Sequence, residues 1–134
     1  MTGLRRDSVI LACAISAGIH GALAPEHLAE DTGAGLGFAA STVLLAVLVL
    51  ALTLRPADYL PVAGAALAFV GLLASYLLAT TTGMPLLNPQ PEPVEGLALA
   101  TKAFEVIGLV TALNLLWRRP AVSLPLTHPK GTLT

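Results

Sequence analysis

The sequence has little charge, few aromatic residues and one cysteine, and each shortage excludes a class of protein. Charged residues occupy 11% of the 134 positions, whereas a soluble domain carries charge at about a quarter of its positions, so a water-facing surface is excluded. The single cysteine, Cys13, excludes an intramolecular disulfide and a zinc site built from several cysteines. A net charge of −1, without a basic stretch interleaved with aromatics, gives no reason to expect nucleic acid as a partner.

Long apolar runs are what the sequence has in excess, with 55% hydrophobic residues and a mean hydropathy of +0.80. A helix rises about 1.5 Å per residue, so roughly 20 apolar residues cross a hydrocarbon core about 30 Å thick. In lipid every backbone polar group needs a bond within the protein, so such runs have to be helices. We predict four membrane-spanning helices, at approximately residues 8–24, 34–54, 59–82 and 97–117.

The connections between these runs are short, which predicts one all-α domain over residues 1–134, a four-transmembrane-helix bundle with up-down-up-down topology. Pro25 suits the first position of a separate short outer helix, and the alternative is that the first helix continues through Pro25 with a kink. The predicted connecting segments are this outer helix at 25–32, a tight turn at 55–58, a proline-rich outer loop at 84–96 and a mobile tail at 118–134.

The distribution of positive charge predicts the orientation, because cytoplasmic loops are enriched in Lys and Arg. With both termini in the cytoplasm, six of the seven cations lie on the inner side. These are Arg5, Arg6, Arg55, Arg118, Arg119 and Lys130. We therefore expect a multi-pass protein of the cell (inner or plasma) membrane, with the lipid bilayer as its first partner.

Four polar side chains fall at one depth, in the outer half of the predicted bundle: His20, Tyr76, Lys102 and Glu105. An ionisable group inside a membrane costs several kcal/mol unless it faces the bundle interior and finds a partner. We therefore expect these side chains to converge.

The first helix adds a polar stripe to this group, because Ser16, His20, His27 and Glu30 follow one another at spacings of four, seven and three residues. Imidazole and carboxylate ligands suit a divalent transition metal such as zinc, copper, iron or manganese. The predicted metal ligands are His20, His27, Glu30 and Glu105, with Ser16, Tyr76 and Lys102 in supporting or structural positions. Heme is disfavoured because only His20 lies well inside the hydrocarbon.

Two other interpretations remain open. Lys102 and Glu105 stand three residues apart on one helix and can form a structural ion pair, in an accessory subunit of a larger transport or respiratory complex. Alternatively, His20 and Glu105 act as acid–base groups of a small proton-coupled carrier or membrane enzyme. No catalytic residue is assigned, because Cys13 has no predicted base beside it. The carrier interpretation favours a homodimer, and the accessory interpretation requires a larger membrane complex.

One stretch of the sequence resembles a known kind of protein. The segment His20-Gly-Ala-Leu-Ala-Pro-Glu-His27-Leu-Ala-Glu30 precedes a second helix containing Gly and Phe and, later, a Glu-Pro-Val loop at 92–94. Over roughly residues 8–117 the chain is similar to small four-helix integral membrane proteins of bacteria. The resemblance implies a fold and no particular activity.

Overall fold

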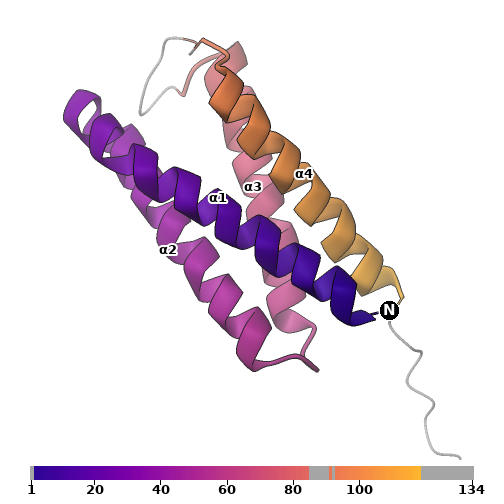
Figure 1. Cartoon of the computed structure of the whole chain (residues 1–134). Helices are drawn as coiled ribbons and strands as arrows, with labels where there is room; N and C mark the ends of the chain where they lie inside the picture. Colours follow the sequence, from indigo (N-terminus) through magenta and orange to yellow (C-terminus); the bar gives the residue numbers. More distant parts are fainter. Residues whose placement is uncertain (1, 85–90, 92, 119–134) are drawn as a thin grey trace, which may run out of the picture.

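The computed structural model of the chain describes residues 2–84, 91 and 93–118. Its helices are α1 (Thr2–Glu30), α2 (Thr32–Leu54), α3 (Leu60–Thr81) and α4 (Gly96–Trp117). The start of α1, the α2–α3 turn and the end of α4 lie at the same end of the molecule (Figure 1). The prediction of an all-α bundle of four helices is confirmed over the described residues.

The helices surround a common axis in the order α2, α1, α4 and α3, so α1 lies between α2 and α4. It packs along most of α2 and also against α4, while α3 packs mainly against α4. The contact between α2 and α3 is less extensive, and α1 and α3 are nearly diagonal. The two helices that carry the predicted polar side chains, α1 and α4, are therefore direct neighbours.

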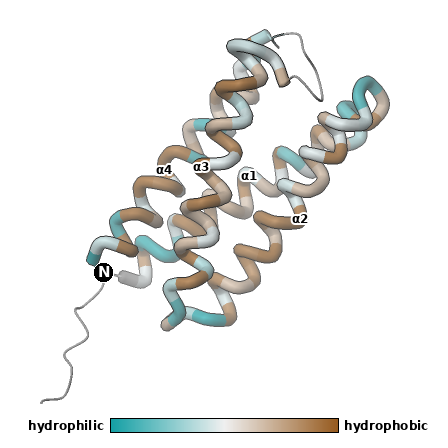
Figure 2. Tube along the Cα trace, turned by 180° about the vertical axis from the view of Figure 1, so that it is seen from behind, coloured by the Kyte–Doolittle hydropathy of each residue, from teal (hydrophilic) through white to brown (hydrophobic). Residues whose placement is uncertain are grey.

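Hydrophobic residues predominate along the middle of the helices (Figure 2). Exposed side chains of α2 include Val47 at 56% and Leu50 at 58%, positions that a water-soluble bundle would fill with polar residues. All four helices are long and apolar enough to cross a membrane. The length and surface of the helices together indicate a multi-pass membrane protein.

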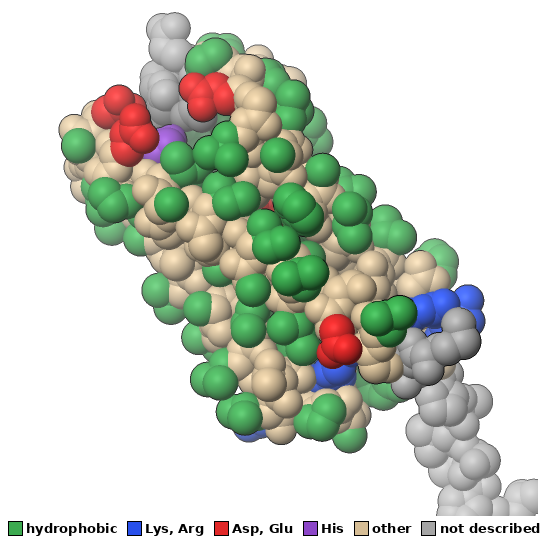
Figure 3. Space-filling view, in the orientation of Figure 1, with side chains coloured by type: hydrophobic (Ala, Val, Ile, Leu, Met, Phe, Trp, Pro, Cys, Tyr) green, Lys and Arg blue, Asp and Glu red, His purple; other side chains and the backbone are tan. Residues whose placement is uncertain are grey.

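Charge is concentrated at the two ends of the bundle (Figure 3). The cations Arg5, Arg6, Arg55 and Arg118 lie where α1 begins and where α2 and α4 end. We call this the cationic end, although Asp7 and Asp58 also lie there. The opposite, acidic end carries Glu26, Glu30, Asp31 and Glu95. This separation is the pattern that the sequence predicts.

The first helix differs from its prediction. Instead of a span at 8–24 and a separate helix at 25–32, α1 is one helix of 29 residues that continues through Pro25. At 1.5 Å per residue it is about 43 Å long, so its last turns extend beyond a hydrocarbon core of about 30 Å. A proline inside a helix removes one backbone hydrogen bond. Here the packing of the last turns of α1 on α2 outweighs that loss.

The turn between α1 and α2 consists of one residue, Asp31. Its carboxylate accepts hydrogen bonds from the backbone N–H groups of Gly33 (2.8 Å) and Ala34 (3.5 Å), which caps α2. Gly35 is buried against α1 so closely that a Cβ there would lie 2.4 Å from the backbone nitrogen of Leu28. Only glycine fits this contact, which brings the first turn of α2 onto the last turns of α1.

Arg6 joins the start of α1 to the α2–α3 turn, which lies 46 to 52 residues away in the sequence. Its Nε donates to the carbonyl of Leu52 at 3.0 Å, and its terminal nitrogens donate to the carbonyls of Arg55 and Asp58. The final carbonyls of a helix have no partner within it. One guanidinium therefore satisfies the end of α2 and fixes the turn.

At the centre of the bundle, the fully buried ring of Phe69 on α3 packs against α4 at Gly108. A Cβ on Gly108 would lie 2.6 Å from the Phe69 ring and 2.8 Å from the Cβ of Ala12 on α1. The missing side chain at position 108 thus allows α1, α3 and α4 to meet.

We predict that Gly108→Ala destabilises the fold by about 1–3 kcal/mol, because the added methyl overpacks the contact with Phe69 and Ala12. Gly71→Ala is the matched control, since nothing lies within 4 Å of a Cβ added to this exposed glycine of α3. Thermal unfolding in detergent measures both variants. Equal unfolding temperatures for the two would contradict the packing described.

The structure describes only part of two predicted segments. Within the proline-rich loop at 84–96, residues 85–90 and 92 lie outside the described residues, as does the tail from residue 119 onward. Arg119 and Lys130, assigned to the cytoplasmic side, belong to that tail.

Candidate functional site

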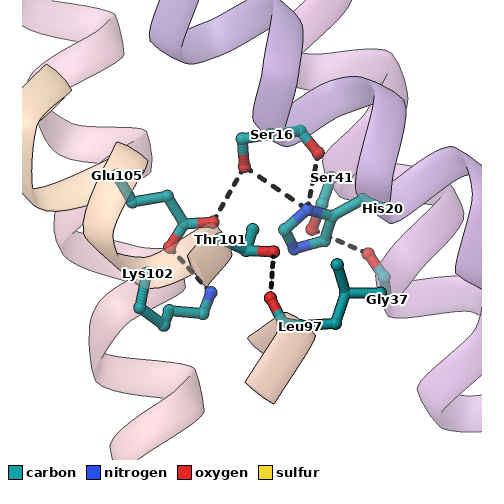
Figure 4. Close-up of polar contacts among 8 residues, drawn as sticks. All are labelled: Ser16, His20, Gly37, Ser41, Leu97, Thr101, Lys102 and Glu105. Carbon is teal, nitrogen blue, oxygen red and sulfur yellow. Dashed lines mark hydrogen bonds and ion pairs between the residues drawn. The ribbon is translucent and has the colours of Figure 1, made fainter. Parts of the chain in front are cut away.

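The candidate site is built around Glu105, the charged residue most deeply placed in the bundle. Thr101, Glu105, Gly108, Ala112 and Leu115 are the buried residues of α4, spaced by four, three, four and three, so they form the inward face of that helix. Glu105 has no exposed surface. Its carboxylate lies between α4 and α1 (Figure 4).

The first partner of this carboxylate is Lys102, one turn earlier on α4. Its Nζ lies 2.7 Å from Glu105 Oε2, and the side chain of Lys102 is 14% exposed. The same ammonium group lies 5.4 Å from the centre of the Tyr76 ring on α3, at cation–π range. Both ends of the ion pair belong to one helix, so the pair neutralises Glu105 without itself joining two helices.

The second partner is Ser16, which provides the link to α1. Its hydroxyl donates to Glu105 Oε1 at 2.8 Å, and both atoms are buried. Ser16 is fully buried on the same face of α1 as Cys13 and His20. Each oxygen of the Glu105 carboxylate therefore accepts one charge-assisted hydrogen bond, from a cation on one side and a hydroxyl on the other.

His20 lies one turn beyond Ser16 and is 7% exposed. Its Nδ1 is 2.8 Å from the carbonyl oxygen of Ser16 and 3.4 Å from the Ser16 hydroxyl. Because a carbonyl only accepts, Nδ1 carries a hydrogen and donates it. In the neutral ring the lone pair then belongs to Nε2. Hydrogen bonds thus connect Lys102, Glu105, Ser16 and His20 in one chain, which we call the buried network.

His27 belongs to a different environment from the buried network. Its Nδ1 lies 3.0 Å from the carbonyl oxygen of Leu23, one turn earlier on α1. Phe38 of α2 packs against both histidines, with ring centres 4.1 Å from His27 and 5.2 Å from His20. An aromatic ring thus contacts both imidazoles on the α2 side.

The structure does not gather the predicted metal ligands into one cluster. Glu30 is exposed at the last residue of α1, and His27 packs on Phe38, whereas Glu105 and His20 belong to the buried network. Among the described residues, no three His, Cys, Asp or Glu side chains are placed to hold a metal ion.

Tyr76 lies on α3, where its ring accompanies Lys102. Its hydroxyl is buried and forms no hydrogen bond with the described part of the chain. A buried hydroxyl without a partner costs about 1–3 kcal/mol. The Tyr76 ring therefore contacts the buried network at Lys102, whereas the Tyr76 hydroxyl forms no hydrogen bond with it.

Two residues of this region were missed by the sequence analysis. Thr101 is buried one turn before Glu105 and donates to the Leu97 carbonyl at 2.8 Å. Phe38 lies in a charge-free apolar run, so nothing in its sequence surroundings marks it as the neighbour of two histidines. For Thr101 the sequence did contain a signal: it stands four residues before Glu105, which places both residues on the same face of the helix.

Comparisons with known proteins add no assignment to this geometry: no family model, no curated protein and no solved structure matches the chain.

We predict that Ser16→Ala lowers the free energy of unfolding by about 1–3 kcal/mol, because a buried carboxylate oxygen loses its hydrogen-bond donor. Ser41→Ala is the matched control: the Ser41 hydroxyl bonds the Gly37 carbonyl within its own helix at 2.8 Å. Unfolding of both variants by increasing sodium dodecyl sulfate in mixed micelles gives the comparison. Identical stabilities would show that the Ser16–Glu105 bond contributes nothing.

Proposed function

We propose that this chain is a small multi-pass membrane protein that accepts and releases a proton at Glu105, as the coupling site of a proton-coupled carrier. The observation that carries the proposal is the buried network, in which a fully buried carboxylate bonds a hydroxyl that contacts an imidazole. Chains of carboxylate and histidine side chains are a recurring form of proton relay inside membranes.

The geometry supports a route that begins at Nε2 of His20, the ring nitrogen with the available lone pair. A proton bound there makes the ring an imidazolium. The Nδ1–H of this imidazolium turns from the Ser16 carbonyl, 2.8 Å away, to the Ser16 hydroxyl oxygen, 3.4 Å away, and passes its proton to that oxygen. The Ser16 hydroxyl gives its own proton to Glu105, 2.8 Å away. The result is a neutral imidazole, a hydroxyl and a carboxylic acid, so one proton has moved from α1 to α4.

Protonation of Glu105 changes the charge balance of the bundle. The ion pair with Lys102 becomes a lone ammonium on a side chain that is 14% exposed. A lone charge in a medium of low dielectric constant is costly. Loading the proton therefore favours an arrangement in which Lys102 reaches water, which links protonation to a change of conformation.

The infrared spectrum of the protein in lipid tests this proposal directly. We predict that lowering the pH produces the carbonyl band of a buried carboxylic acid, and that Glu105→Gln removes this band. The matched control is Glu30→Gln, which replaces an exposed carboxylate at the end of α1 and leaves the band in place.

The same experiment separates the proposal from its structural alternative. In an accessory subunit whose Lys102–Glu105 pair is only structural, the folded protein keeps this ion pair and shows no acid band. A spectrum without the acid band in the folded wild-type protein would therefore contradict proton handling and favour the accessory role.

A transition-metal site remains a second proposal, supported by one feature of the structure: an imidazole and a carboxylate, those of His20 and Glu105, both bond Ser16. If this chain binds a transition metal, we predict that the protein purified from metal-replete cells contains stoichiometric zinc, copper, iron or manganese, measured by elemental analysis. His20→Ala then abolishes it. Lys102→Ala preserves or strengthens it, because removing a nearby positive charge favours a cation. Metal-free wild-type protein would oppose this proposal.

The orientation is also proposed: the cationic end faces the cytoplasm, with both termini, in the cell membrane. The support is the concentration of arginine at one end of the bundle. A cysteine introduced at Ala57, in the exposed α2–α3 turn, should resist an impermeant thiol reagent added to intact cells. Labelling from outside would reverse the orientation.

A further inference from the structure

A groove between α2 and α3 lies at the cationic end, away from the buried network. The two helices share a tight turn and diverge from it (Figures 1 and 2). The groove has a volume of about 450 Å³, within the range of about 300–1,000 Å³ that is typical of ligand sites. Leu48 and Ala51 of α2 and Ala63, Gly64 and Leu67 of α3 form its apolar walls.

Small residues on α3 shape this groove. A Cβ on Gly64 would lie 3.0 Å from Cδ2 of Leu48, so the leucine covers the position where a side chain would otherwise stand. Ala63 and Leu67 continue the α3 wall, and Leu67 is 74% exposed. In a bilayer, these apolar walls of the groove are open to lipid chains.

The mouth of the groove carries two opposite charges, Arg55 and Asp58. They are not paired with each other, since the ion pair of the described residues joins Lys102 and Glu105. Arg55 is exposed, and no ion pair of the described residues holds its guanidinium. One oxygen of Asp58 accepts from the Leu60 N–H at 2.9 Å, which leaves the second oxygen available.

We propose that this groove binds an aminophospholipid, a glycerophospholipid whose headgroup joins a phosphate to a primary ammonium. An acyl chain occupies the groove, the phosphate lies on Arg55 and the ammonium lies on Asp58. A guanidinium presents two parallel N–H donors to a phosphate, and an ammonium offers three donors to a carboxylate. The proposal is independent of the buried network.

The headgroup gives this site its selectivity. Lipid chains surround the whole bundle, so burying one more chain in an apolar groove distinguishes no lipid from another. A choline headgroup has no N–H to donate to Asp58. A glycerol headgroup brings a net negative charge towards that carboxylate and has no ammonium to neutralise it. The pair Arg55 and Asp58 is complementary to a zwitterion with a primary amine.

Native mass spectrometry of the full chain in detergent tests the proposal. Phosphatidylethanolamine, phosphatidylcholine and phosphatidylglycerol with identical acyl chains are titrated separately. The ethanolamine lipid should bind about tenfold more tightly than either competitor, as expected for one additional charge-assisted contact. Equal affinities for the three lipids would overturn the proposal.

Two charge variants test the headgroup contacts. Arg55→Gln should weaken binding of the ethanolamine lipid about tenfold through the lost phosphate contact. Asp58→Asn keeps a side-chain oxygen for the Leu60 N–H, because asparagine forms the same side-chain-to-backbone turn as aspartate, but should remove the preference for ethanolamine over choline. A preference that survives Asp58→Asn would contradict the assigned ammonium contact.

The groove itself is tested by Ala63→Leu, which fills it and should weaken binding of all three lipids. Ala74→Leu is the matched control, an exposed position of α3 outside the groove. Circular dichroism shows that each variant remains helical. If glycerophosphoethanolamine, which has the headgroup but no acyl chains, displaced the bound lipid at equal concentration, the acyl-chain part of the proposal would be wrong.

Discussion

The negative charge of Glu105 is the constraint on which the centre of this bundle depends. The carboxylate has no exposed surface, so each of its oxygens needs a partner from the protein. Lys102 neutralises it from within α4, and Ser16 bonds it from α1. The first interaction is possible in an isolated helix, but the second requires α1 and α4 to be in one register. A single buried charge thus specifies how two helices meet.

The packing around this register depends on small residues at the points of closest approach. Gly108 admits the ring of Phe69 one turn below Glu105, and Gly35 brings α2 onto the backbone of Leu28. Interhelix packing in membranes relies on close contact and hydrogen bonding, because lipid tails are as apolar as the side chains. Polar atoms set the register, and glycines allow the helices to approach closely.

Much of the fold could be predicted from the sequence, because the hydrocarbon thickness makes apolar runs recognisable as helices whatever their contacts. The inward orientation of the Glu105 side chain could also be predicted, since exposing a carboxylate to lipid is too costly. Two features could not be predicted in the same way. The continuity of α1 through Pro25 depends on packing against α2, which outweighs local propensity. The contact of Phe38 with the two histidines of α1 depends on how α2 is rotated about its own axis. The apolar run that forms α2 has no polar stripe, so the sequence does not indicate that rotation.

The one-residue turn at Asp31 has a mechanical consequence. Two helices joined by a longer loop can slide or tilt separately, but α1 and α2 share a capped turn and a backbone contact at Gly35. Arg6 ties their other ends together through the Leu52 carbonyl. The two helices are thus fastened to each other at both ends. A movement of this pair relative to α3 and α4 would act directly on the Ser16–Glu105 hydrogen bond, which joins α1 to α4.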